Sequence, residues 1–162
     1  MTPTQCTQHD AATIAMLISE ANKEVAVRFG LNADNCPKHP SFCTTSWVEA
    51  EMARGDTYFM LHDPPAGPIA CVAYERPAPA RAYLNRLSVL PPHQGQGAGA
   101  HLVAHVVEQA RRDGVASISI GVIGEHLHLQ RWYNKLGFVD GETKRFAHLP
   151  FSVKYMTLAV PD

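Results

Sequence analysis

Three glycines at alternate positions, Gly95, Gly97 and Gly99, are the feature of the 162-residue sequence that most directly indicates chemistry. They follow an apolar segment that ends at Pro91 and Pro92, and they precede a segment with helical periodicity. Glycines leave the backbone N–H groups unobstructed, and the N-terminus of the following helix carries partial positive charge. Together these features predict a binding site for a phosphate-bearing ligand.

Two other kinds of glycine-rich loop do not fit these residues. An NTPase phosphate loop needs Lys followed by Ser or Thr after its last glycine, whereas Ala100 and His101 follow here. A dinucleotide-binding fold needs a spaced G-x-G-x-x-G and an acid about 20 residues later, at the end of a second strand. Asp113, the acid nearest to that spacing, lies instead at the end of the expected helix. The remaining alternative is a plain turn between a strand and a helix.

A second pattern lies about 35 residues further along, where Tyr133 is followed by Gly137 and Phe138. The two patterns, in this order, resemble the GCN5-related N-acetyltransferase (GNAT) family. In that family Gln-x-x-Gly-x-Gly, here Gln94-x-x-Gly97-x-Gly99, is the loop for the acyl-CoA pyrophosphate. The second family pattern is Asn-x-x-Ala-x-x-x-Tyr-x-x-x-Gly-Phe. The resemblance covers residues 8–160.

This chain departs from the family pattern at two positions, with His126 in place of Asn and Leu129 in place of Ala. The resemblance implies that acetyl-CoA is the cosubstrate and that an amine attacks its thioester directly. It also implies that Tyr133 protonates the leaving thiolate and that the N–H of Val89 polarises the thioester carbonyl. The alternative role for Tyr133 is packing. The expected acetyl-CoA-binding residues are Leu87, Ser88, Val89, Gln94, Gly95, Gln96, Gly97, Ala98, Gly99, Ala100 and His126.

The residue that many relatives use as the general base is absent, because Asn85 and Arg86 occupy the strand segment where those relatives have Glu. Asn cannot act as a base. Glu75, at the end of the neighbouring strand, is one substitute, and His148, in the loop between the last two strands, is another, because imidazole titrates in the right range. A chain of water molecules to solvent is a third option.

Two loops are expected to form the acceptor pocket, residues 36–43 and 146–151, because each combines a histidine with proline and an aromatic residue. The expected acceptor-binding residues are His39, His148 and Phe151. Cys36, His39 and Cys43 also suggest a structural zinc site, but their spacing matches no common zinc motif and no fourth ligand is evident. We therefore expect no metal, with packing of both cysteines as the simpler interpretation.

Hydrophobic periodicity predicts the elements that must position these residues. A helix capped by Asp10 is followed by a loop over 30–45, and a capping box of Ser46 and Glu49 opens a short helix that ends at Gly55. The other expected helices cover 97–112 and 125–136. The expected strands cover 57–62, 69–74, 82–89, 117–122, 143–147 and 153–160, with a weak initial strand within 2–7.

The order of these elements predicts an α+β fold with a mixed, mostly antiparallel sheet and helices on both faces. The strand–helix–strand unit at 82–122 needs a crossover, so its two strands should be parallel. By resemblance this is the GNAT-like acyl-CoA N-acyltransferase fold, in a single domain over residues 1–162.

The composition excludes several classes of function. The formal net charge is −1 without a basic block, which argues against nucleic-acid binding. No apolar run approaches the ~20 residues of a membrane span, and the first ten residues lack the pattern of a secretory signal. Four cysteines without dense spacing favour reduced thiols and a cytoplasmic location.

The resulting hypothesis is a cytoplasmic N-acetyltransferase that acts on a small-molecule or peptide amine, either as a monomer or as a homodimer. The alternative is a non-catalytic domain of the same fold that binds acyl-CoA as a sensor or subunit. The missing strand Glu favours the alternative, whereas Tyr133 favours the enzyme.

Overall fold

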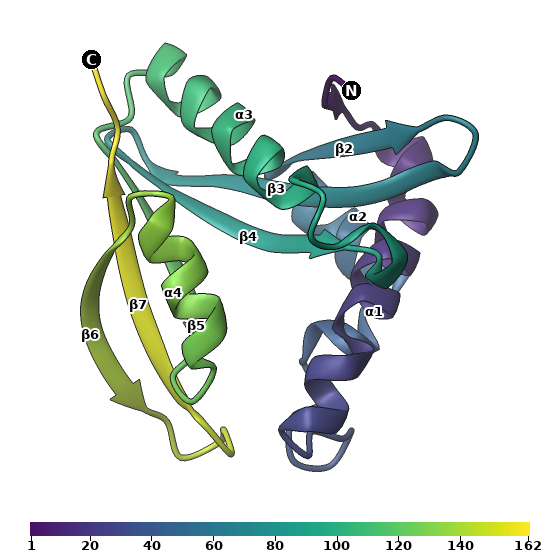
Figure 1. Cartoon of the computed structure of the whole chain (residues 1–162), viewed down its shortest axis with the longest axis vertical. Helices are drawn as coiled ribbons and strands as arrows, with labels where there is room; N and C mark the ends of the chain where they lie inside the picture. Colours follow the sequence, from purple (N-terminus) through teal and green to yellow (C-terminus); the bar gives the residue numbers. More distant parts are fainter.

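The computed structural model describes all 162 residues and contains one seven-stranded sheet with the order β1-β2-β3-β4-β5-β7-β6 (Figure 1). Only β4 and β5 are parallel, and all other neighbouring strands are antiparallel. The strands are β1 (Thr4–Gln5), β2 (Thr57–Asp63), β3 (Gly67–Ala78), β4 (Arg81–Val89), β5 (Ser117–Ile123), β6 (Val139–Arg145) and β7 (Ser152–Ala159). The helices are α1 (Ala11–Arg28), α2 (Thr45–Ala53), α3 (Ala98–Arg112) and α4 (Leu127–Lys135), with short 3-10 turns η1 (Gln8–Asp10), η2 (Pro40–Phe42) and η3 (Pro91–His93).

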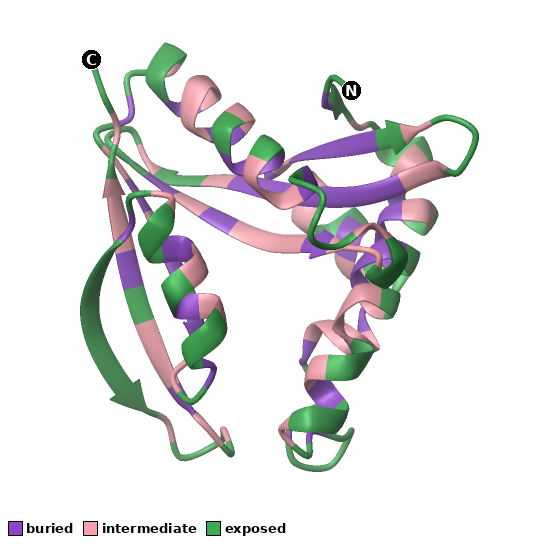
Figure 2. Ribbon diagram, viewed as in Figure 1, coloured by how far each residue is buried: buried purple, intermediate pink, exposed green.

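Helices cover both faces of this sheet, which confirms the predicted α+β class. Side chains of a strand alternate between the two faces, so neighbouring residues enter different cores. Phe59 and Leu61 pack with α3 and α4, whereas Tyr58 and Met60 pack with α1 and α2. Because both faces are buried, the central strands are continuous apolar runs, visible as buried segments in Figure 2.

The predicted strands and helices are all present, and the parallel pairing of β4 with β5 is confirmed, but the bounds of three elements were wrong. β3 extends over Gly67–Ala78 rather than 69–74. β6 begins at Val139 rather than Thr143, and all seven of its residues are exposed (Figure 2). Its only strand neighbour is β7, so it carries no hydrophobic alternation from which the sequence could reveal it. α4 begins at Leu127, because the carboxylate of Glu125 instead accepts hydrogen bonds from the backbone N–H and hydroxyl of Ser152.

The helix caps also differ from the predicted ones. Asp10 precedes α1, but its carboxylate accepts from the backbone N–H of Thr7 at 2.8 Å and makes no capping bond to α1. The cap of α2 is Thr44, whose hydroxyl accepts from the N–H of Trp47, so the helix starts before the predicted Ser46. A Thr-x-x-Trp cap lacks the reciprocal Glu of a capping box, which is why the sequence favoured the later start.

A β-bulge in β4 determines how this strand presents its side chains. Three residues of β3, from Cys71 to Ala73, lie opposite four of β4, from Asn85 to Ser88. Arg86 takes up the extra length with φ 59°, a left-handed conformation that non-glycine residues rarely adopt. The bulge interrupts the alternation, so Asn85 and Arg86 both reach groups on the α2 side of the sheet.

Past the bulge, β4 and β5 are no longer hydrogen-bonded to each other. Their ladder consists of three pairs and ends at Tyr83 and Ser119, although β4 continues to Val89 and β5 to Ile123. Figure 1 shows the two strands diverging, with α1 and α4 on either side of the opening. The two strands are therefore separated near Val89. None of the helices has the length and apolar character needed to cross a bilayer.

Candidate active site

A cleft with a volume of about 460 Å³ occupies the space where β4 and β5 diverge. Its walls come from these two strands, from α1 and the loop that follows it, from α2, and from α4 and β7. The polar and ionisable residues that line it are Asn22, His39, Glu51, Arg54, Asn85, Arg86, His126 and Tyr133. The cleft thus collects polar groups from segments that are far apart in the sequence.

The glycine loop leads from the open end of β4 into α3. Gly95 and Gly97 have φ values of 76° and 87°, and Gly97 is the N-cap residue of α3. Gly99 is needed for a different reason, since a Cβ there would lie 3.2 Å from the Trp132 ring of α4. Gln94, Gly95, Gln96 and Gly97 are exposed, whereas Ala98 is buried and Ala100 is partly buried. The exposed turn at the start of α3 has the geometry that binds anions.

The backbone of Val89 faces the opening between the strands. Leu90 donates its N–H to Ile69 of β3, and the facing pair, Val89 and Ala70, is therefore a pair without mutual hydrogen bonds. The N–H and C=O of Val89 consequently point away from β3, and Gln94 donates a hydrogen bond to this carbonyl at 3.0 Å. The N–H of Val89 lies beyond the end of the β4–β5 ladder and is directed at the cleft.

Tyr133 of α4 lines the same cleft from the opposite side. Its ring is buried and packs edge-on against Trp132 and Phe138, with centroids 5.0 and 5.3 Å apart. Burial raises the pKa of the phenol well above its usual range, so the group stays protonated at neutral pH. No buried side-chain oxygen or nitrogen in the protein lacks a partner, and the Tyr133 hydroxyl makes no hydrogen bond within the protein, so it is open to the cleft.

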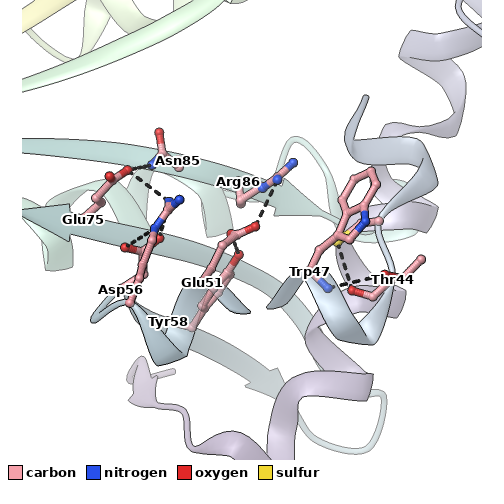
Figure 3. Close-up of polar contacts among 10 residues, drawn as sticks. Thr44, Trp47, Glu51, Asp56, Tyr58, Glu75, Asn85 and Arg86 are labelled. Atoms are coloured by element: carbon pink, nitrogen blue, oxygen red, sulfur yellow. Dashed lines mark hydrogen bonds and ion pairs between the residues drawn. The ribbon is translucent and has the colours of Figure 1, made fainter. Parts of the chain in front are cut away.

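Two charged networks lie on the α2 side of the cleft (Figure 3). In the first, the Glu51 carboxylate accepts from the Tyr58 hydroxyl at 2.6 Å and from Nη2 of Arg86 at 3.1 Å. The Arg86 guanidinium also stacks on Trp47, with Cζ 5.7 Å from the ring centroid. Both oxygens of Glu51 are thus engaged, which makes it an orienting group for Arg86 rather than a free base.

In the second network, Arg54 donates two hydrogen bonds to the Asp56 carboxylate, at 3.2 and 2.8 Å (Figure 3). Nη2 of Arg54 also lies 3.4 Å from Oε1 of Glu75, which accepts from the Asn85 amide at 2.9 Å. Glu75 itself does not line the cleft, but Asn85 and Arg54 do. The candidate base, Glu75, therefore lies behind the cleft wall, and the side chains of Asn85 and Arg54 lie between it and the cleft.

The structure brings two of the three expected acceptor-binding residues into the cleft. His39 is buried, lies on the wall, and accepts a hydrogen bond from the N–H of Ser41 through Nδ1. Phe151 also lines the cleft. His148 is exposed, stacks on Phe146 with ring centroids 5.8 Å apart, and is not among the cleft residues.

Of the expected acetyl-CoA-binding residues on β4 and at the start of α4, some line the cleft and others do not. Leu87 and His126 line the cleft, whereas the Ser88 side chain is buried against α1 and accepts from Asn22. His126 caps α4, since its Nδ1 accepts from the N–H of Leu129, and its ring lies 5.4 Å from that of Phe29.

The two cysteines of the candidate zinc site pack in different places. Cys36 belongs to a small apolar cluster with Ala26 and Leu31, and Cys43 belongs to the core beneath α1. No group of three or more His, Cys, Asp or Glu side chains is arranged to hold a metal ion.

Sequence reasoning missed Glu51, Arg54 and Asn22 as cleft residues, and it considered Arg86 only as a replacement for a base. One available signal was the charge of Arg86 in the interior of a predicted strand. The partner Glu51 carried no comparable signal, because a glutamate on a short helix is ordinarily a solvated residue.

Burial, and next the charge of Arg86, lower the pKa of His39. The folded protein therefore binds a proton at His39 less readily than the unfolded chain does, so stability contributed by neutral His39 is lost as the pH falls below ~6.5. We expect the His39→Asn variant, which keeps a capping acceptor, to lose less unfolding free energy than wild type between pH 7 and pH 5 in urea titrations. The control, exposed His148→Asn, should follow the wild-type slope, and equal slopes for both variants would contradict the assignment.

Comparison with protein families gives a match to the acetyltransferase (GNAT) family over residues 30–138, which includes the glycine loop and Tyr133. No curated protein sequence matches the chain.

Solved structures match over nearly the whole chain at low identity. The ribosomal-protein-S18-alanine N-acetyltransferase from Escherichia coli superposes with a TM-score of 0.78 at 17% identity, over 99% of this chain and 94% of that one. The putative acetyltransferase yncA from Salmonella typhimurium, solved with its cofactor acetyl-CoA, gives 0.70 at 19% identity, over 100% and 95%. A putative GNAT acetyltransferase from Desulfovibrio desulfuricans gives 0.75 at 17% identity, over 99% and 100%. At these identities the structural likeness establishes the fold.

Proposed function

The chain belongs to the acetyltransferase (GNAT) family and is an acetyl-CoA-dependent acyltransferase, and from this premise we propose that it acetylates a primary amine of a small-molecule or peptide acceptor by direct attack. The observation that carries the proposal is the opening between β4 and β5. Tyr133 lines the cleft at this opening, the N–H of Val89 lies past the end of the β4–β5 ladder, and Gly97 caps α3 beyond the end of β4. These three groups support a path for acetyl-CoA that runs from the glycine turn, past the end of β4, to Tyr133.

The residues fit the shape and chemistry of acetyl-CoA. The turn from Gln94 to Gly97 offers exposed N–H groups to the pyrophosphate, and the free edge of β4 from Leu87 to Val89 offers backbone groups to the amide-containing pantetheine arm. When bound, acetyl-CoA supplies an activated thioester.

Each step of transfer has a candidate group in the cleft or beside it. The Val89 N–H would donate to the carbonyl oxygen as negative charge develops on it. As the new C–N bond forms and the C–S bond breaks, Tyr133 would give its proton to the departing sulfur, and Glu75 would take the amine proton through water. The hydrogen bond from Asn85 holds the Glu75 carboxylate behind the wall that the amine approaches.

The proposal is tested by incubating the purified protein with acetyl-CoA and a panel of primary amines. Released thiol and acetylated products are measured, the products by mass spectrometry. We expect acetylation of at least one amine class at a rate well above hydrolysis of acetyl-CoA alone. Tight binding of acetyl-CoA in calorimetry without acetylation of any amine would instead support the non-catalytic sensor.

The Glu75→Gln variant tests the base. Gln retains an oxygen that can accept from Asn85 but cannot take up a proton at neutral pH, so we expect kcat to fall at least about tenfold with an altered acidic limb of the pH–rate profile. Acetyl-CoA affinity should stay unchanged. Glu108→Gln, at a partly exposed position on α3, is the control. An unchanged profile, with chemistry shown to limit the rate, would remove Glu75 from the mechanism.

A further inference from the structure

Arg86 is the cleft cation that the protein leaves with the most free hydrogen-bond donors. The β4 bulge directs its side chain to the α2 side, where Glu51 and Trp47 fix the guanidinium from two directions (Figure 3). Its side chain is only 21% exposed, and it lies in the cleft wall. A planar cation is therefore held in one orientation before any ligand arrives.

The hydrogen bonds of Arg86 leave most of its donors unused. A guanidinium carries five N–H donors, and in this protein only Nη2 donates, to Oε2 of Glu51. Since no buried side-chain nitrogen lacks a partner, the unused donors of Arg86 are open to the cleft. The other oxygen of Glu51 accepts from the neutral Tyr58 hydroxyl, so Glu51 pairs with Arg86 through Oε2 alone.

Arg54, the second guanidinium in the cleft, differs in this respect. It donates two hydrogen bonds to Asp56 and also lies within ion-pair distance of Glu75. Two carboxylates therefore face this one cation. Arg86, with one carboxylate partner and one donor in use, is better placed than Arg54 to receive an anion.

We propose that Arg86 binds a carboxylate of the acceptor, so that the substrates are small amines that carry a carboxylate, of the amino-acid type. This inference rests on the proposed function. The planar guanidinium, with several free donors, matches the two oxygens of a carboxylate, whereas a doubly charged phosphate would need more positive charge than Arg86 paired with Glu51 offers. The cleft volume of about 460 Å³ must also receive the end of the pantetheine arm, which favours a small acceptor.

Matched acceptor pairs test the inference. Each of the twenty amino acids is offered as the free acid and as its amide, and the acetylated products are quantified by mass spectrometry. We expect the best free acids to react with a kcat/KM at least tenfold above that of their amides. The preference should fall toward unity in Arg86→Gln and in the double variant Arg86→Gln/Glu51→Gln, which leaves no buried carboxylate unpaired. Arg86→Lys should retain part of it, because the charge remains without the planar fork.

A second readout does not depend on turnover. Phenylglyoxal modifies accessible guanidinium groups, and peptide mass spectrometry reports the labelling of Arg86. Free acids that react should protect Arg86, and their amides should not. Arg81→Gln, the same charge change at the exposed start of β4, is the control and should keep the preference.

The outcomes separate this inference from the proposed function. Acetylation of acids and amides at equal rates, or absence of Arg86 protection by every free acid, would overturn the carboxylate assignment and leave the acetyltransferase assignment intact. Absence of acetyl-CoA binding in calorimetry would refute the proposed function, whereas protection of Arg86 by free acids alone would still support the anion receptor.

Discussion

The Tyr133→Phe variant is expected to lower kcat by about 10²-fold or more, because it removes the only phenol proton in the cleft. The change deletes one oxygen and keeps the ring that packs against Trp132 and Phe138. Since the hydroxyl makes no hydrogen bond within the protein, stability should be nearly unchanged. The measurement is single-turnover acetylation, in which product release does not contribute.

The appropriate control is Tyr155→Phe, at a partly exposed position on β7 that does not line the cleft. Acetyl-CoA affinity should be equal in both variants and in wild type, since the loss concerns only the departing thiolate. Because burial raises the pKa of Tyr133, the wild-type phenol stays protonated through the neutral range and its ionisation should not produce a basic limb there. A wild-type single-turnover rate in Tyr133→Phe would refute the acid role.

The Gly97→Asp variant is expected to weaken acetyl-CoA binding by about 10²-fold, which corresponds to ~2.7 kcal/mol. Gly97 is the N-cap of α3, so an added carboxylate would occupy the position at which the helix terminus and the turn attract the pyrophosphate. Calorimetric titration with acetyl-CoA measures the loss, and it should shrink at high salt because part of it is charge repulsion.

Gly114→Asp is a matched control for this variant. Gly114 follows the other end of α3 and has a similar left-handed φ of 74°, and a Cβ at either position would meet no atom within 4 Å. The two substitutions therefore impose comparable backbone strain, and their difference isolates the effect on the ligand. Equal acetyl-CoA affinity in a folded Gly97→Asp protein and in Gly114→Asp would show that the loop does not hold the pyrophosphate.

Much of the fold followed from local sequence patterns. The parallel pairing of β4 with β5 followed from the strand–helix–strand order. The exposed strand β6 was misplaced by four residues at its start, because its pairing with β7 depends on backbone hydrogen bonds that leave no trace in side-chain polarity.

The two expected acceptor loops show the limit of composition as a guide. Both combine histidine, proline and an aromatic residue, yet His39 is buried in the cleft wall while His148 is exposed beside Phe146. The direction of a loop side chain depends on the packing of the elements on either side of the loop. His39 is held by the short turn that it caps beneath α1, and no such constraint acts on His148.

The sequence by itself determined the features that arise between close neighbours along the chain: the glycine turn that begins α3, the Tyr-x-x-x-Gly-Phe end of α4, and the periodicities that define most elements. Only the tertiary structure decided which charges meet in the cleft. The left-handed bulge at Arg86 directs its guanidinium to Glu51, 35 residues earlier in the chain, and Tyr58 and Trp47 complete the arrangement. Such contacts depend on the packing of α2 against the sheet, since the free energy that fixes them comes from burial of distant segments together rather than from any local preference.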